Sequence, residues 1–258
     1  NKITFGNVAG MLDIYVGADG SPVDAIDDIT PSAYEEAWGS GSGTINDIGG
    51  LAGQMGIGAK VSLPILGTLD AKYIPKADSV ESADNANSAD GNAGVGSGES
   101  YSLKTNLADL PVIGGFLDGA TLTTGYETVE GTTVAQAAET SDLTAAINYS
   151  IGNFAIGVQR KVHQEFQTAA TAEQTEYKDL AIGLVYSIND ALSVSYNRYD
   201  SYRSNDSSKN PEQEITAINI GYTIGGMTSG FQDASTNNAG WVLDAEDDST
   251  TLGVSVAF

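Results

Sequence analysis

Large apolar residues alternate with small or polar ones along much of the chain. In the last stretch, 248–258, every second residue from Leu252 onward is apolar and its neighbours are Thr, Gly, Ser or Ala. The same alternation fills 141–151, 175–188 and 212–224. Successive side chains of a β-strand point to opposite faces, so this period predicts strands with one apolar face and one small, polar face.

The alternation and its interruptions predict about twelve strands. They cover residues 2–6, 55–64, 68–76, 100–107, 116–128, 141–151, 153–165, 175–188, 190–202, 212–224, 226–233 and 248–258. Short connections (65–67, 108–115, 152, 189 and 225) alternate with long ones (7–54, 77–99, 129–140, 166–174, 203–211 and 234–247). Short turns at one rim and long loops at the other are typical of an antiparallel transmembrane β-barrel.

A soluble β-sandwich or barrel is the alternative explanation of the strands. No stretch approaches the ~20 apolar residues of a membrane-spanning helix, so the chain is either soluble or crosses a membrane as strands. In a soluble barrel the polar face would be solvated and highly charged. Here that face carries mostly Gly, Ala, Ser, Thr and Asn. Aromatic residues lie near the strand ends, where interfacial girdles form, namely Tyr101, Tyr126, Tyr149, Phe154, Tyr177, Tyr186, Tyr202, Tyr222 and Phe258.

Composition narrows the function. The chain has 34 acidic residues against 11 Lys and Arg, a net charge of -23, which would repel nucleic acid. It has no Cys and His163 is its single His, so thiolate chemistry and sites with several histidines are excluded. Abundant Gly and Tyr with few Pro favour strands and tight turns. We therefore expect an all-β protein without enzymatic activity.

Both ends of the chain resemble a known family. The ending Thr251-Leu-Gly-Val-Ser-Val-Ala-Phe258 resembles the C-terminal strand of Gram-negative outer-membrane proteins. The opening Lys2-Ile-Thr-Phe-Gly-Asn-Val-Ala-Gly10, with the acidic segment after it, resembles the strand and inward-folded third loop of general bacterial porins of the alphaproteobacterial type. The resemblance implies passive diffusion of small hydrophilic solutes and ions through a homotrimer in the bacterial outer membrane. It also implies contact with membrane lipid and lipopolysaccharide.

Porins of this family have 16 strands, and the third loop follows the fifth. Residues 2–6 would then be the end of the fifth strand and eleven strands would follow. The chain then lacks the first four strands of the family pattern, and residues 2–6 are shorter than a membrane-spanning strand, so we expect either that upstream sequence is missing or that 2–6 is not the fifth strand. On this reading residues 1–258 form a single β-barrel domain, with 7–54 as its constriction loop.

The segment 7–54 is the candidate for a pore constriction, because charged rows set the ion preference of a channel. It holds eight acids and no base. The proposed constriction acids are Asp19, Asp24, Asp27, Asp28, Glu35 and Glu36. Thr30 before Pro31 and Glu35 three residues after Ser32 predict a short helical turn. A solvated acidic surface loop is the competing reading of any one of these acids.

Basic residues fall on the polar parity of the strands. They are Lys60, Lys72, Lys104 and Lys161, which we expect on the pore wall. In porins that resemble this chain, acids of the third loop oppose bases of the wall. The excess of acids predicts a preference for cations. Apolar residues such as Ile26, Tyr34 and Trp38 lie among the acids, so we expect the segment to pack inside the barrel.

The period also assigns faces. Leu180, Ile182, Leu184, Leu252, Val254 and Val256 should face lipid, and Asn148, Asn219, Gly253 and Ser255 the lumen. No cofactor is expected, although the loop carboxylates Asp24, Asp27, Asp28, Asp244, Glu246, Asp247 and Asp248 could bind Ca²⁺ weakly. The alternative functions are a substrate-specific outer-membrane channel, a secreted acidic adhesin or calcium-binding β protein, and an outer-membrane enzyme.

Overall fold

Alternating residues form long antiparallel strands in the computed structural model of the chain. The structure describes residues 2–8, 11–38, 43, 45, 47–75, 97–111, 114–130, 139–165, 174–205 and 208–256. Phe258 and most of the expected loop 77–99 lie outside them. No helix among the described residues is long and apolar enough to span a bilayer.

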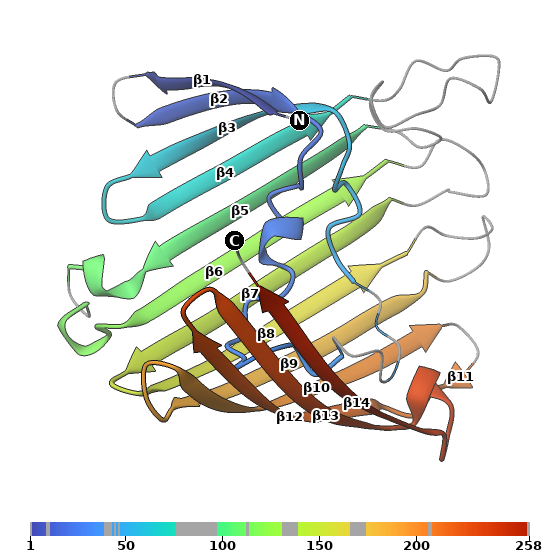
Figure 1. Cartoon of the computed structure of the whole chain (residues 1–258). Helices are drawn as coiled ribbons and strands as arrows, with labels where there is room; N and C mark the ends of the chain where they lie inside the picture. The colour runs from blue at the N-terminus through green and yellow to red at the C-terminus, as the bar shows by residue number, and fades with distance from the viewer. Residues whose placement is uncertain are drawn as a thin grey trace. The chain divides into compact units, whose positions relative to one another are not determined.

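The strands follow one another in chain order (Figure 1). They are β1 (Lys2–Val8), β2 (Leu12–Gly17), β3 (Gly56–Leu63), β4 (Gly67–Ile74), β5 (Gly98–Asn106), β6 (Ala120–Val129), β7 (Thr140–Ile151), β8 (Phe154–Gln164), β9 (Glu176–Ser187), β10 (Leu192–Asn205), β11 (Ser208–Lys209), β12 (Gln213–Ile224), β13 (Met227–Asn237) and β14 (Glu246–Val256). Within the sheet, the short β11 pairs with β10 beside the main path. Short 3-10 turns cover Asp24–Ile26, Leu107–Asp109, Gly114–Phe116 and Ala239–Trp241.

One expected boundary is wrong. The expected loop 7–54 includes residues 12–17, but these residues form β2, which pairs with β1 and with β3. Leu12, Ile14 and Val16 alternate with Asp13 and Tyr15, which is a strand pattern of only six residues. The acids around it hid this period. The connection before β3 therefore runs from 18 to 55, and we call residues 18–55 the loop segment.

The chain divides into two compact units. Unit 1 comprises residues 1–27, 47–145 and 161–176, and unit 2 comprises residues 28–46, 146–160 and 177–258. In unit 1 each of the strands β1 to β6 pairs antiparallel with the next. In unit 2 the ladder joins β10 to β12, β12 to β13 and β13 to β14. The expected tight turns at 65–67, 152 and 225 are confirmed.

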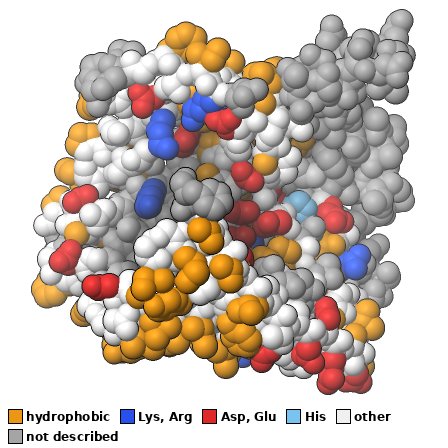
Figure 2. Space-filling model, viewed as in Figure 1, with side chains coloured by type: hydrophobic (Ala, Val, Ile, Leu, Met, Phe, Trp, Pro, Cys, Tyr) orange, Lys and Arg blue, Asp and Glu red, His pale blue; other side chains and the backbone are white. Residues whose placement is uncertain are grey.

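The two faces of most of the longer strands, such as β8, β9 and β12, differ in burial. Alternate residues on one face are large, apolar and exposed, such as Leu252 at 77% and Ile218 at 58%. Space-filling atoms show apolar side chains gathered over β12, β13 and β14 (Figure 2). Val254 and Val256 on β14 and Leu184 on β9 are exposed as expected, while Leu180 and Ile182 on β9 are half-buried. We call this side the apolar face.

The opposite face carries the small and polar residues and lies against the loop segment. We call it the loop face. Asn219 is fully buried on it, and Asn148 and Gly253 contact the loop segment there. Ser255 shares the parity of Gly253. Tyr177 also belongs to this face: it is buried and packs against Trp241 with ring centroids 5.2 Å apart, so its expected place in an interfacial girdle is wrong. Its odd position in β9 opposes that of Tyr186.

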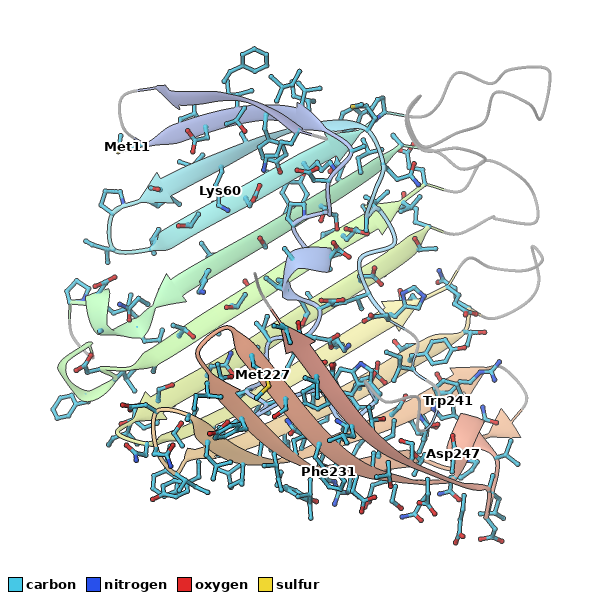
Figure 3. All side chains as sticks on the ribbon, viewed as in Figure 1. Met11, Lys60, Met227, Phe231, Trp241 and Asp247 are labelled. Carbon is cyan, nitrogen blue, oxygen red and sulfur yellow. The ribbon has the colours of Figure 1, made fainter. Side chains whose placement is uncertain are left out.

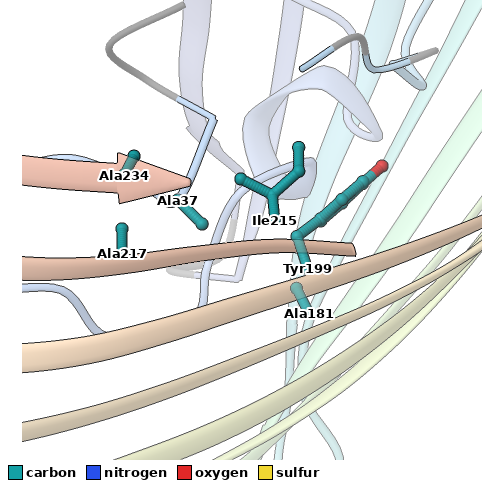
Figure 4. Packing of buried hydrophobic residues seen from close by; sticks show 6 residues of the cluster. All are labelled: Ala37, Ala181, Tyr199, Ile215, Ala217 and Ala234. Atoms are coloured by element: carbon teal, nitrogen blue, oxygen red, sulfur yellow. The ribbon is translucent and has the colours of Figure 1, made fainter. Parts of the chain in front are cut away.

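Apolar residues on the loop face form small clusters under the loop segment. In unit 2, Ala37 packs with residues of β9, β10, β12 and β13, namely Ala181, Tyr199, Ile215, Ala217 and Ala234 (Figure 4). In unit 1, Leu51 packs with Ile74 and Val129. Each cluster joins one part of the loop segment to the strands. The described core therefore consists of contacts between the loop segment and the polar-parity face.

Candidate functional site

In unit 1 the loop segment begins with a turn that packs against Gly125 of β6. The Val23 amide donates to Ser100 Oγ at 3.1 Å, and the Val23 side chain is fully buried. A Cβ on Gly125 would lie 2.6 Å from Ile26 Cδ1. Gly125 therefore leaves the space that Ile26 occupies. This is a local reason why the segment follows the strands rather than extending into solvent.

Charged side chains hold the last part of the loop segment, residues 47–55. Lys161 Nζ lies 3.2 Å from Asp47 Oδ1, and the lysine side chain is 1% exposed. The Gly49 amide donates to Asp142 Oδ2 at 2.9 Å, and His163 Nδ1 contacts the other oxygen of Asp142.

The next contact of this stretch combines a buried carboxylate with apolar packing. The Leu51 amide donates to Glu127 Oε1 at 2.8 Å. The leucine side chain is fully buried, and a Cβ on Gly98 would lie 2.6 Å from it. Buried carboxylates are stable only when such donors satisfy them. The ionic contacts thus fix where the segment returns to β3.

Neutral amides and hydroxyls hold residues 28–38 in unit 2. The Ile29 amide donates to Gln159 Oε1 at 3.1 Å, and Asn148 Nδ2 donates to the Ile29 carbonyl at 2.8 Å. Asn197 Nδ2 donates to the Pro31 carbonyl at 3.0 Å. The strand side chains thereby satisfy backbone groups that have no ladder partner. This stretch therefore lies along the loop face through hydrogen bonds of its backbone.

Two aromatic residues complete this contact. The ring of Tyr34 lies against Gly230 and Gly253, where any Cβ would collide with it. Trp38 packs on Tyr199 with centroids 4.4 Å apart. The expected helical turn after Pro31 is wrong. Ser32 Oγ instead donates to the Glu35 carbonyl at 2.5 Å, and residues 30–38 form bends and a turn.

The six proposed constriction acids occupy different surroundings. Asp19 is exposed in unit 1, and Asp24 is half-buried nearby. Burial, followed by the charge of Asp47, raises the pKa of Asp24 above its ordinary 3.8, while Lys72 opposes the rise. Asp27, the last residue of the range 1–27 of unit 1, and Asp28, the first residue of unit 2, are half-buried. These four acids lie in the first part of the loop segment.

Glu35 and Glu36 belong to unit 2. Both are half-buried, and their backbone carbonyls accept hydrogen bonds from Gln232 Nε2. Burial and the neighbouring Glu36 raise the pKa of Glu35 above its ordinary 4.5. The loop segment therefore carries two groups of acids, one in each unit.

The four proposed wall lysines also differ. Lys60, on β3, is exposed and lies 3.5 Å from Asp70 (Figure 3). Lys72 is 2% exposed and donates to the carbonyls of Asp19 and Gln54 at 2.8 and 3.0 Å. Lys161 is buried with Asp47, as described above. Lys104 is exposed on β5, opposite Thr68. Lys72 and Lys161 thus anchor the loop segment, whereas Lys60 and Lys104 present their charges to solvent.

Asp19, Lys60 and Lys72 line a common pocket in unit 1 of about 230 Å³. Lys2, Tyr15 and Asp70 complete its charged and aromatic lining. The sequence prediction did not include these three residues. Tyr15 lies in the unrecognised strand β2, whereas Lys2 and Asp70 lie in the expected strands 2–6 and 68–76. The prediction also left out the amide side chains that support residues 28–38. Their only signal in the sequence is a polar residue at every second position.

Comparisons with known proteins find similarity in structure and not in sequence. No family model matches the chain, and no curated protein matches it. A solved porin structure superposes over 100% of this chain and 80% of its own, with a TM-score of 0.68 and 14% identity.

Two further solved structures agree with this comparison. OmpT, an outer-membrane protein of Vibrio cholerae, covers 98% of this chain and 79% of its own at a TM-score of 0.60 and 11% identity. OmpF of Salmonella typhi, solved with daunomycin, covers 94% and 74% at 0.61 and 13% identity. Despite its divergent sequence, the chain has the antiparallel transmembrane β-barrel fold of outer-membrane porins.

Proposed function

We propose that the chain forms a water-filled channel in the bacterial outer membrane, through which small hydrophilic solutes and ions diffuse passively. The observation that carries this proposal is the placement of the loop segment. It follows the polar-parity face of the strands through its backbone and apolar side chains, and it leaves acids such as Asp19 exposed. A channel needs this combination of a polar lumen and a charged constriction.

The apolar face supports a membrane location. Leu252, Val254 and Ile218 expose between 58% and 77% of their surfaces, and their neighbours on the same face are also apolar. Contiguous apolar surface of this kind suits the lipid-facing band of a barrel. A secreted, water-soluble adhesin would not require a contiguous apolar surface of this kind. We assign the apolar face to lipid and the loop face to the lumen, with lipid and lipopolysaccharide as the surrounding partners.

The charge balance favours cations. Eight acids and no base lie in 7–54, and of the four lysines only Lys60 and Lys104 are exposed. The buried Lys72 and Lys161 are paired with the loop segment and contribute less to the potential of the lumen. We therefore propose that the potential near the segment is negative. We also propose that the chain assembles as a homotrimer and that it has no enzymatic activity.

Planar-bilayer recording tests the function. The purified chain, reconstituted with a KCl gradient across the bilayer, should give stepwise, ohmic conductance and a reversal potential of the sign that cation preference requires. The absence of conductance from correctly folded protein would contradict the channel. Conductance with anion preference would retain the channel and refute the charge assignment. Crosslinking in the membrane tests the trimer separately.

A further inference from the structure

The connection between β13 and β14, residues 238–245, places one aromatic side chain on the loop face of unit 2, and we call these residues the strap. The indole ring of Trp241 packs on Tyr177 of β9 (Figure 3). Its Nε1 donates to Ser201 Oγ of β10 at 3.1 Å. The guanidinium carbon of Arg203, also on β10, lies 5.7 Å from the centre of the indole ring, within the range of a cation–π contact. Strands β9 and β10 therefore hold Trp241 by three different contacts.

The backbone of the strap is strained at the same residue. Trp241 is 7% exposed, whereas its neighbours Val242 and Leu243 are 59% and 69% exposed. The φ angle of Trp241 is 59°, a left-handed conformation that is an outlier for a bulky side chain. Such a conformation persists where the surrounding contacts fix it. The shape of the strap therefore depends on the burial of the indole ring.

Hydrogen bonds connect the base of the strap to β12. Asn238 Nδ2 donates to the Glu212 carbonyl at 2.8 Å, and the Gly240 amide donates to Gln213 Oε1 at 2.8 Å. Gln213 begins β12 and Glu212 directly precedes it. The strap thus starts on β12 and reaches β9 and β10 through Trp241.

The positions that are covered along β10 show what the strap adds. Ser195, Tyr199 and Ser201 are buried on the loop face of this strand. Ser195 Oγ accepts a hydrogen bond from the Ala33 amide at 3.0 Å, and Tyr199 packs on Trp38, so the loop segment covers both residues. Ser201, further along the same face, contacts Trp241. The strap therefore covers the loop face beyond the contacts of residues 33 and 38.

We propose that Trp241 is a positioning residue that holds the strap over the lumen as a second narrowing of the channel, next to the loop segment. The inference rests on the proposed channel function and deepens it. Solutes that pass along the loop face of unit 2 meet the strap as well as the loop segment. The largest solute that the channel admits then depends on the ring of Trp241, because removal of the ring frees a strained backbone to move away.

Thiol labelling measures whether the ring covers the strand. The chain has no Cys, so Ser201→Cys introduces a single thiol. In the folded protein in detergent, a water-soluble methanethiosulfonate reagent should react slowly with this thiol. Adding Trp241→Ala should raise the labelling rate at least about tenfold, since the thiol then reacts without prior local opening. Ser195→Cys is the matched control on the same strand and face, and Trp241→Ala should leave its labelling rate unchanged because the loop segment covers it.

Single-channel recording in planar bilayers measures the narrowing. Trp241→Ala should raise the conductance and allow larger poly(ethylene glycol) molecules to enter the pore. Trp241→Phe keeps an aromatic ring but loses the hydrogen bond to Ser201, so its conductance should lie between those of the parent protein and Trp241→Ala. Leu243→Ala alters an exposed neighbour in the strap and should leave the conductance and the polymer size limit unchanged.

The inference is overturned in three ways. A Ser201→Cys thiol that reacts rapidly beside Trp241, or that stays slow without it, would show that the ring does not cover the strand. Equal acceleration of both thiols by Trp241→Ala would mean that Trp241 supports the whole sheet. Unchanged conductance of Trp241→Ala would mean that the strap narrows no conducting path. A failure of the proposed channel is distinct from these results, because it abolishes the conductance of the parent protein and leaves the labelling in detergent unaffected.

Discussion

The ammonium group of Lys161 lies 3.2 Å from the carboxylate of Asp47, and the lysine side chain is almost completely buried while the aspartate is 41% exposed. The pair connects strand β8 to the last part of the loop segment. Because the lysine is buried and the aspartate is not, replacing one partner should change the stability by a different amount from replacing the other. When Asp47 is removed, the charge of Lys161 stays in the protein interior, whereas the carboxylate of Asp47 is solvated when Lys161 is removed.

Asp47→Asn should therefore destabilise the protein more than Lys161→Gln. We expect a loss of about 1.5–3 kcal/mol for Asp47→Asn, the range for a hydrogen bond to a charged group. Urea unfolding in lipid vesicles measures both variants. Equal losses would mean that the buried lysine has sufficient other contacts and that Asp47 does not fix the loop segment.

The contact of Tyr34 with Gly230 gives a second test. Gly230→Ala places a methyl group in the space of the ring, so Tyr34 must move. We expect lower stability, altered conductance and a compensating effect of Tyr34→Ala in the double variant. A double-mutant cycle of unfolding free energies measures this coupling. Additive effects would show that the ring does not hold the segment on β13.

As the pH falls, the cation preference should begin to weaken at a higher pH than it would if all the carboxyl groups had their ordinary pKa values. Burial raises the pKa of Asp24 and of Glu35 above their ordinary 3.8 and 4.5, so both lose their charge at a higher pH than exposed acids do. The folded form binds these protons more tightly than the unfolded chain, so these two groups add stability as the pH falls through their folded pKa values. A weaker cation preference at acid pH would therefore result from the loss of these charges and not from unfolding of the protein.

Reversal potentials recorded from neutral to acid pH provide the measurement. Asp24→Asn and Glu35→Gln together should reduce the preference at neutral pH and flatten its pH dependence. An unchanged pH profile in the double variant would show that other carboxylates control selectivity.

The apolar face predicts a strong difference between two lysine substitutions. Leu252→Lys should cost about 2–4 kcal/mol if its site lies near the middle of the bilayer, since charge on the lipid face is costly there. Ser102→Lys, on the loop face beside Asp70, should cost far less. Unfolding in phospholipid vesicles compares them. Similar, small losses would indicate that Leu252 faces water.

Most strands were predictable because they carry a period of two, and the turns at 152 and 225 were predictable because the apolar stretches stop there. Strand β2 was not, since six residues with an aspartate inside them give a weak period. Of the candidate site, only its general kind was predictable, namely an acidic loop segment that lies against strands with inward-facing lysines. Sequence marked Lys72 as inward-facing, but its burial depends on carbonyl groups of the folded loop segment. Such contacts join residues 18 to 53 positions apart, and no local pattern encodes them.

The single-channel conductance of a variant lacking residues 19–36 tests the central claim most directly. This deletion removes all six proposed constriction acids. Heat-modifiable migration in detergent gels confirms that the variant still folds. We predict that conductance rises and that cation preference falls in the same recordings. Unchanged conductance and selectivity in a folded variant would contradict the account, because the loop segment would then not be the constriction.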